Sequence, residues 1–184
     1  MSATEGNMGT LEGNPPASAI GMIGAIWGIL GVTAIIGSAV WRLTPYAIHA
    51  FDYSFSVMQW VVFVGFTIFM AFGEGYRGFQ KAFSPRVAAR ALHLSKNPVP
   101  LRVIFAPFFC MGFFGATRKR KIVTWCLTTG IVILVILVRQ LEQPWRGIID
   151  FGVVLGLGWG IIAMWIFCAK AFFGSKFDRD PEVA

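Results

Sequence analysis

Four long apolar runs are the feature that most constrains the fold of this chain. They cover residues 18–40, 53–73, 122–138 and 148–173. The hydrocarbon core of a bilayer is about 30 Å thick, and a helix needs about twenty residues to cross it. Lipid offers no partner to an unpaired backbone group, and none of the runs alternates polar and apolar residues as a barrel strand does. The sequence therefore predicts an all-α integral membrane protein with four transmembrane helices.

The composition agrees with this class of protein. The chain is 56% hydrophobic and 14% charged, whereas soluble globular chains are about one quarter charged. We therefore expect a single membrane domain over residues 18–173, with a flexible tail at residues 1–17 and a second short tail at residues 174–184.

A fifth apolar stretch, residues 103–116, is too short for an ordinary span. It has fourteen residues and contains Pro107, which removes one helical hydrogen bond. Apolar segments of this length are typical of re-entrant or interfacial elements. We expect it to return to the side of the membrane from which it came.

The distribution of Lys and Arg predicts the orientation, because cytoplasmic loops retain positive charge. With four spans, thirteen of the sixteen cations share one side, and Arg42, Arg139 and Arg146 lie on the other. The thirteen are Arg77, Lys81, Arg86, Arg90, Lys96, Arg102, Arg118, Lys119, Arg120, Lys121, Lys170, Lys176 and Arg179. We expect a multi-pass protein of the cell inner (plasma) membrane with both termini in the cytoplasm. The first apolar run is longer than a secretory signal and lacks a basic flank, so we expect it to be retained.

The segment between the second and third spans carries ten basic residues and one acid, Glu74. Ser84 and Pro85 are typical of a helix start, and Arg86, Arg90 and His93 would share one face of the helix that follows. The pattern predicts a short amphipathic helix over residues 85–94, lying on the membrane surface. The residues predicted to contact lipid headgroups or a partner are Arg77, Lys81, Arg86, Arg90, Arg118, Lys119, Arg120 and Lys121. The alternative is that these cations serve only as a topology signal.

Glycines at steps of three or four predict the closest helix contacts, because membrane helices associate through small residues. The predicted packing glycines are Gly24, Gly28 and Gly31 in the first helix and Gly152, Gly156 and Gly160 in the last. They indicate either packing of the first helix on the last or a seam with another subunit.

Little in the sequence indicates catalysis. No ionisable residue is expected near the centre of a span: Glu74 is placed at the inner end of the second helix, where Arg77 offers an ion pair, and Asp150 at the start of the fourth. Two histidines expected on opposite sides cannot share a metal, and three cysteines without a metal-ligand spacing are expected to be buried as small apolar residues. We therefore expect no cofactor and no metal, and catalysis lacks a visible nucleophile or base.

The predicted function is that of a non-catalytic accessory, assembly or scaffold subunit, whose basic loop contacts anionic lipid or an acidic partner. Membership of a membrane-protein complex or a homo-oligomer is compatible with the sequence, whereas nucleic acid is not an expected partner. The alternative is a small oligomeric transporter or channel that uses residues 103–116, because broken membrane segments can line transport sites. A third hypothesis is a lipid-modifying enzyme that uses Glu74, Tyr76, Arg77 and His93 at headgroup level.

Overall fold

The structure is a computed structural model that describes residues 18–174, 177 and 179–183. In this part of the chain nearly all of the regular structure is helical, with an isolated antiparallel bridge between Ala116 and Val183. The helices are α1 (Ala19–His49), the 3-10 turn η1 (Ala50–Asp52), α2 (Val57–Met70), the π-helix η2 (Ala71–Phe83), α3 (Ser84–Lys96), α4 (Pro100–Ile104), α5 (Ala106–Met111), α6 (Arg118–Val138) and α7 (Trp145–Phe173). The predicted tail at residues 1–17 lies outside the described residues.

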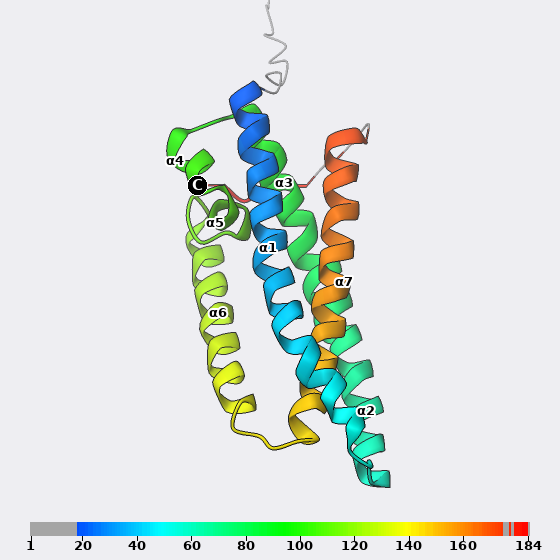
Figure 1. Cartoon of the computed structure of the whole chain (residues 1–184). Coiled ribbons are helices and arrows are strands. Elements are labelled where there is room, and N and C mark those ends of the chain that lie inside the picture. Colours follow the sequence, from blue (N-terminus) through cyan, green and yellow to red (C-terminus); the bar gives the residue numbers. More distant parts are fainter. Residues whose placement is uncertain (1–17, 175–176, 178, 184) are drawn as a thin grey trace, which may run out of the picture.

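Four helical segments are long and apolar enough to cross a membrane: residues 19–52, 57–96, 118–138 and 145–173. Each contains most of one predicted run, so the prediction of an all-α protein with four potential spans is confirmed. The start of α1, the end of α3, the short helices α4 and α5, the start of α6 and the end of α7 lie toward one end of the bundle (Figure 1). We call this the basic end, because Arg90, Lys96, Arg102 and the basic run 118–121 lie there.

The second helix runs much further than the sequence predicted. Ser56 begins it with a capping box, in which its hydroxyl accepts from the Gln59 amide and the Gln59 side chain accepts from the Ser56 amide. It then continues through η2 and Pro85 into α3 as one helical segment of 40 residues, about 60 Å of α-helix. Ser84 therefore does not cap a new helix: its backbone is helical and its hydroxyl is buried. We attribute the continuation to η2, whose wider turns accommodate the proline ring.

The helix predicted to lie on the membrane surface is instead packed inside the bundle. Nine of the thirteen residues of α3 are buried, and α3 lies between α1 and α7. The predicted apolar face makes these contacts, because Val87, Ala88 and Ala91 join a core that includes Val32 of α1 and Met164 of α7. Small side chains let three helix backbones approach closely, and this burial replaces the expected contact with lipid.

Residues 103–116 form part of α4, all of α5 and a turn, at the basic end of the bundle (Figure 1). The helical path breaks at Phe105, directly before Ala106 and Pro107 begin α5. Gly112 ends α5 with a φ of 90°, a conformation that favours glycine. The segment starts and finishes at the same end, so it does not add another crossing of the bundle.

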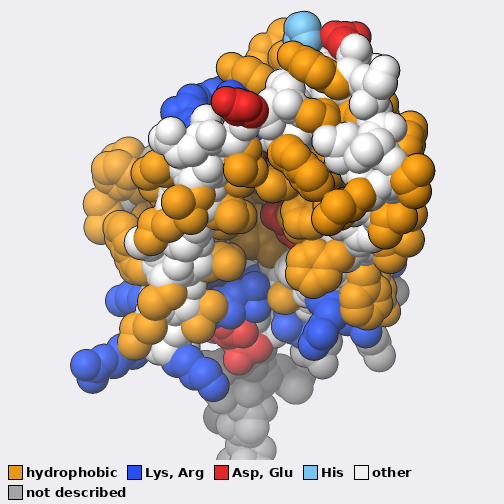
Figure 2. Space-filling view, turned by 90° about the horizontal axis from the view of Figure 1, so that it is seen from below, with side chains coloured by type: hydrophobic (Ala, Val, Ile, Leu, Met, Phe, Trp, Pro, Cys, Tyr) orange, Lys and Arg blue, Asp and Glu red, His pale blue; other side chains and the backbone are white. Residues whose placement is uncertain are grey.

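Helix α6 stands beside the bundle and contacts it little (Figure 1). Val138 is its one buried residue. Seen from below the view of Figure 1, hydrophobic side chains cover much of the molecule and a hollow opens at its centre (Figure 2). The compact core is therefore built by α1, α3, α5 and α7, and α6 leaves nearly all its side chains free to contact lipid or other helices.

Candidate functional site

Arg90 of α3 is the most unusual polar residue of the basic end. Only 2% of it is exposed. Its Nη2 donates to the carbonyl of Gly115 at 2.7 Å, and its guanidinium lies 4.6 Å from the centre of the Phe109 ring. Within the described part of the chain, its Nε and Nη1 have no hydrogen-bond partner. Leaving donors of a buried cation unpaired is costly, so this arrangement needs an explanation.

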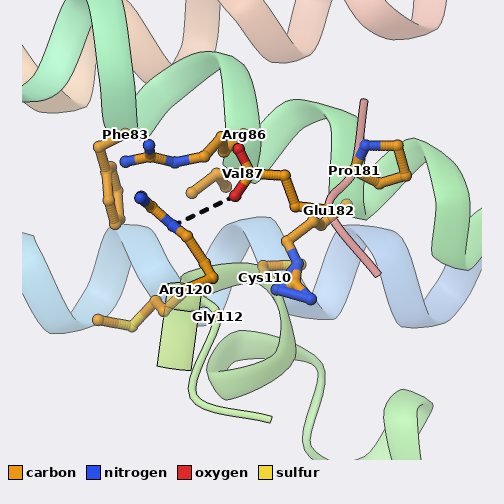
Figure 3. Close-up of a pocket in the computed structure, with 10 residues that line it drawn as sticks. Phe83, Arg86, Val87, Cys110, Gly112, Arg120, Pro181 and Glu182 are labelled. Carbon is orange, nitrogen blue, oxygen red and sulfur yellow. Dashed lines mark ion pairs between the residues drawn. The ribbon is translucent and has the colours of Figure 1, made fainter. Parts of the chain in front are cut away.

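Two further arginines line the same pocket as Arg90. Arg86 comes from the first turn of α3 and Arg120 from the first turn of α6, and their side chains lie close to the carboxylate of Glu182 (Figure 3). The distance from Arg120 Nε to Glu182 Oε2 is 3.5 Å. Three arginines and one glutamate thus line the pocket, which therefore has an excess of positive charge.

The pocket is small as it stands. Its volume is about 10 Å³, which is the space that about one water molecule requires. Phe83, Val87, Cys110 and Met111 supply its apolar walls. An anion larger than water can therefore enter only if a side chain moves out.

The carboxylate reaches the pocket on what we call the C-terminal strap, residues 179–183. The strap pairs with the chain just before α6, where the Thr117 amide donates to the Glu182 carbonyl at 3.2 Å and Ala116 bridges Val183. Gly115, with a φ of 57°, turns the chain so that Ala116 and Thr117 are free to make this pairing. The C-terminal residues were expected to be only a tail, and those of the strap cover the pocket.

The eight predicted contact residues separate into two groups. Arg86, Arg90 and Arg120 converge on the pocket. The remaining five, Arg77, Lys81, Arg118, Lys119 and Lys121, are exposed. Glu182 was not predicted to belong to the site, because it lies 92 positions beyond Arg90 and has no motif around it. A signal for the burial of Arg90 was present, because small residues flank it in Ala88, Ala89 and Ala91.

The six predicted packing glycines lie in tight contacts, but the two sets face different partners. An added Cβ at Gly152 would lie 2.8 Å from Phe66, and at Gly160 it would lie 2.5 Å from Phe79, so the α7 glycines face the second helix. The glycines of α1 face the basic end instead: Gly24 faces Leu94 and Val103, Gly28 faces Ala106 and Cys110, and Gly31 faces Pro107. Helices α1 and α7 pack together, but these glycines do not lie at the contact between the two helices.

Glu74 lies deeper in the bundle than its position in the sequence indicates. Its carboxylate packs on Gly156, where an added Cβ would be 2.9 Å from Glu74 Oε2. Gly156 is the twelfth of the 29 residues of α7, so the carboxylate faces the middle of that helix and not the end of a span. The structure shows no ion pair between Glu74 and Arg77 within the described residues, and the expectation of such a pair is wrong.

The remaining candidates do not converge on one site. Glu74 and His93 lie nineteen residues apart on one continuous helical segment, roughly 28 Å, so the residues of the enzyme hypothesis cannot share one headgroup. Asp150 is buried and pairs with Arg146 at 3.5 Å. Cys110 and Cys168 belong to the core, whereas Cys126 is exposed on α6. Among the described residues, no three His, Cys, Asp or Glu side chains are grouped as a metal site would require.

Comparison with known proteins adds no family to these observations. No protein-family model, curated protein or solved structure matches the chain.

Proposed function

We propose that this protein is a non-catalytic accessory, assembly or scaffold subunit of the cell inner membrane. Its termini lie in the cytoplasm, and its basic end contacts anionic lipid or an acidic partner. The observation that carries this proposal is the excess of arginine in a pocket at the basic end of an otherwise apolar bundle. Each well-placed Lys or Arg near an anionic surface contributes about 1 kcal/mol of attraction.

Helix α6 supports the scaffold role. Its apolar side chains are exposed along the whole helix, among them Ile133, Leu134 and Leu137. A transmembrane helix that packs little on its own bundle can take part in contacts with helices of another subunit.

Gentle purification followed by mass spectrometry of what stays bound tests this proposal. We expect either a stoichiometric protein partner or retained anionic lipid. A variant that replaces Arg118, Lys119 and Lys121 by Gln should lose bound lipid or partner, while a variant with Arg139 replaced by Gln at the other end should not. A monomer that carries neither lipid nor protein would contradict the proposal.

A second candidate is a small oligomeric transporter or channel that uses residues 103–116. The break of the helical path at Phe105 and the close packing of α5 on Gly28 and Gly31 favour it, because discontinuous helices line many transport sites. It predicts symmetric oligomers in mild detergent and solute flux in liposomes, both of which the scaffold role does not require.

A further inference from the structure

We propose that Arg86, Arg90 and Arg120 form a binding site for a phosphate group, and that Glu182 occupies this site until the ligand displaces it. This inference rests on the proposed contact with anionic groups and narrows it to one pocket and one chemistry. The phosphate could belong to a lipid headgroup or be free in solution, and the two sources are separated by the test below.

The guanidinium of Arg90 is fixed in place and still has unpaired donors. The Gly115 carbonyl accepts from its Nη2, and the Phe109 ring packs against it. Its Nη1 lies beside Gly112, where an added Cβ would be 3.4 Å away, and both residues line the pocket. Because 98% of the residue is buried, bulk solvent does not reach its unpaired donors. The unpaired Nε and Nη1 lie on different edges of the guanidinium, so each is left to donate a separate charge-assisted bond of the kind that phosphate oxygens accept.

The pocket has an excess of positive charge. Glu182 is the one acid among the lining residues, which include three arginines, and its carboxylate pairs with Arg120 at 3.5 Å. It does not reach hydrogen-bonding distance of the free donors of Arg90. A phosphate group carries more oxygens than a carboxylate and can contact several guanidinium groups at once, so it would satisfy donors that Glu182 leaves unpaired.

The strap is attached to the body of the protein at few points. These are the isolated bridge, which includes the bond from the Thr117 amide to the Glu182 carbonyl, the Arg120 ion pair, and Val183, which packs against the core. With Glu182 in place the cavity has room for about one water molecule. Entry of phosphate therefore requires displacement of the carboxylate, which couples ligand binding to release of residues 179–183.

The location favours a ligand near the membrane boundary. Arg120 lies in the first turn of α6, next to Arg118, Lys119 and Lys121, and that helix is one of the four potential spans. Headgroup phosphates of anionic lipids are found at this depth. Exposed neighbouring cations would raise the local concentration of the anion, and the pocket would bind it.

The test measures binding to the full chain purified in a maltoside detergent. The probes are dioctanoyl-phosphatidylglycerol, inorganic phosphate, and dioctanoylglycerol as the lipid without phosphate. Isothermal titration gives the affinity, and hydrogen exchange at the Thr117 amide reports on the strap, because this amide donates to the Glu182 carbonyl. We expect binding of a phosphate-bearing probe, no binding of dioctanoylglycerol, and faster exchange at Thr117 when the site is occupied.

The variants distinguish binding in the pocket from nonspecific electrostatic attraction to the basic end. Arg120→Gln should weaken binding about tenfold, the effect of losing a charge-assisted contact, whereas Lys119→Gln removes the same charge from an exposed neighbour and should have a small effect. Glu182→Gln should tighten binding several-fold and speed exchange at Thr117 without ligand. Arg86→Gln serves as a second test, since it does not depend on removing buried Arg90.

The outcomes are distinct. Binding of the lipid probe supports a headgroup site, and binding of inorganic phosphate alone supports a free-phosphate site. Two results would overturn the pocket: an equal loss of affinity in Arg120→Gln and Lys119→Gln, or an exchange rate at the Thr117 amide that does not change on binding. Either result would still be compatible with nonspecific lipid contact and with the proposed function. If no phosphate-bearing probe binds, the pocket is overturned, and the scaffold role then depends on the copurified protein.

Discussion

Glycines on one face of α7 set how closely the second helix approaches it. At Gly152, Gly156 and Gly160 an added Cβ would collide with Phe66, Glu74 and Phe79, respectively. Gly158, between two of them, points away and has nothing within 4 Å. The same helix thus contains packing positions and a neighbouring control position.

We predict that Gly160→Ala destabilises the protein and that Gly158→Ala does not. At Gly160 the new methyl would meet Phe79 Cγ at 2.5 Å, an atom near the backbone that cannot swing aside, and such overpacking costs about 1–3 kcal/mol. At Gly158 the methyl meets open space, and alanine favours the helix. Thermal unfolding in mild detergent should show a lower Tm for Gly160→Ala alone; equal Tm values would contradict the packing described.

Cys110 shows how burial changes the chemistry of a side chain. Burial raises the pKa of its thiol from 9.0 to about 12, although Arg90 nearby lowers it and Cys168 raises it further. The neutral thiol therefore adds to folding stability in full below pH 9, and this contribution is lost as the pH rises toward 12.

We predict that Cys110 resists alkylation in the folded protein. Maleimides react with the thiolate, and at pH 8 a pKa near 12 leaves about one thiol in ten thousand ionised. Peptide mapping after treatment with N-ethylmaleimide should find Cys110 unmodified in detergent and modified after unfolding in SDS. An added Asn97→Cys, at an exposed position, provides the reactive control. Rapid labelling of folded Cys110 would show that it is not buried.

At the scale of elements, the second helix differs most from what the sequence indicated. The apolar run ends near Gly73 and is followed by polar residues. A prediction based on the length of the apolar run therefore ends the second helix there. The helix itself continues for more than twenty residues, because η2 leads into α3 without a break and α3 packs against α1 and α7. Arg90 is buried by residues distant in the sequence, such as Gly115 and Phe109. The periodicity of the local sequence therefore does not predict its burial. The caps at Ser18 and Ser56, in contrast, follow from local sequence.

The return of α3 along α1 predicts a crosslink. The Ser18 amide donates to the Ser95 carbonyl at 3.0 Å, so cysteines placed at Ser18 and Ser95 should form a disulfide under mild oxidation. A pair at Ser38 and Ser95 should not, because Ser38 lies twenty residues further along α1, about 30 Å. Mass spectrometry of the linked peptides distinguishes the pairs. Failure of the first pair, with both cysteines accessible, would indicate that residues 84–96 leave the bundle.

At the scale of the whole molecule, the four apolar runs were sufficient to predict four helices that could cross a membrane. Their number and order follow from hydrophobicity, because every backbone polar group must be paired within a helix in lipid, whereas the length of the second helix does not. The site could be predicted only in part. Charge density indicated the arginines, but which three converge depends on the turn at Gly115 and on a C-terminal segment distant in sequence. The sequence likewise does not predict that α6 packs little on the rest of the bundle, because helices that face lipid and helices that face protein are equally apolar.

We expect the basic segments before and after residues 103–116 to lie on one side of the membrane. The most direct test labels single cysteines at Lys96, Lys119 and Arg139 with a membrane-impermeant maleimide, in sealed vesicles of known orientation. We expect Lys96→Cys and Lys119→Cys to react from the same compartment and Arg139→Cys from the opposite one. Reaction of Lys96→Cys and Lys119→Cys from opposite compartments would contradict the account, because the chain would then cross the membrane between them.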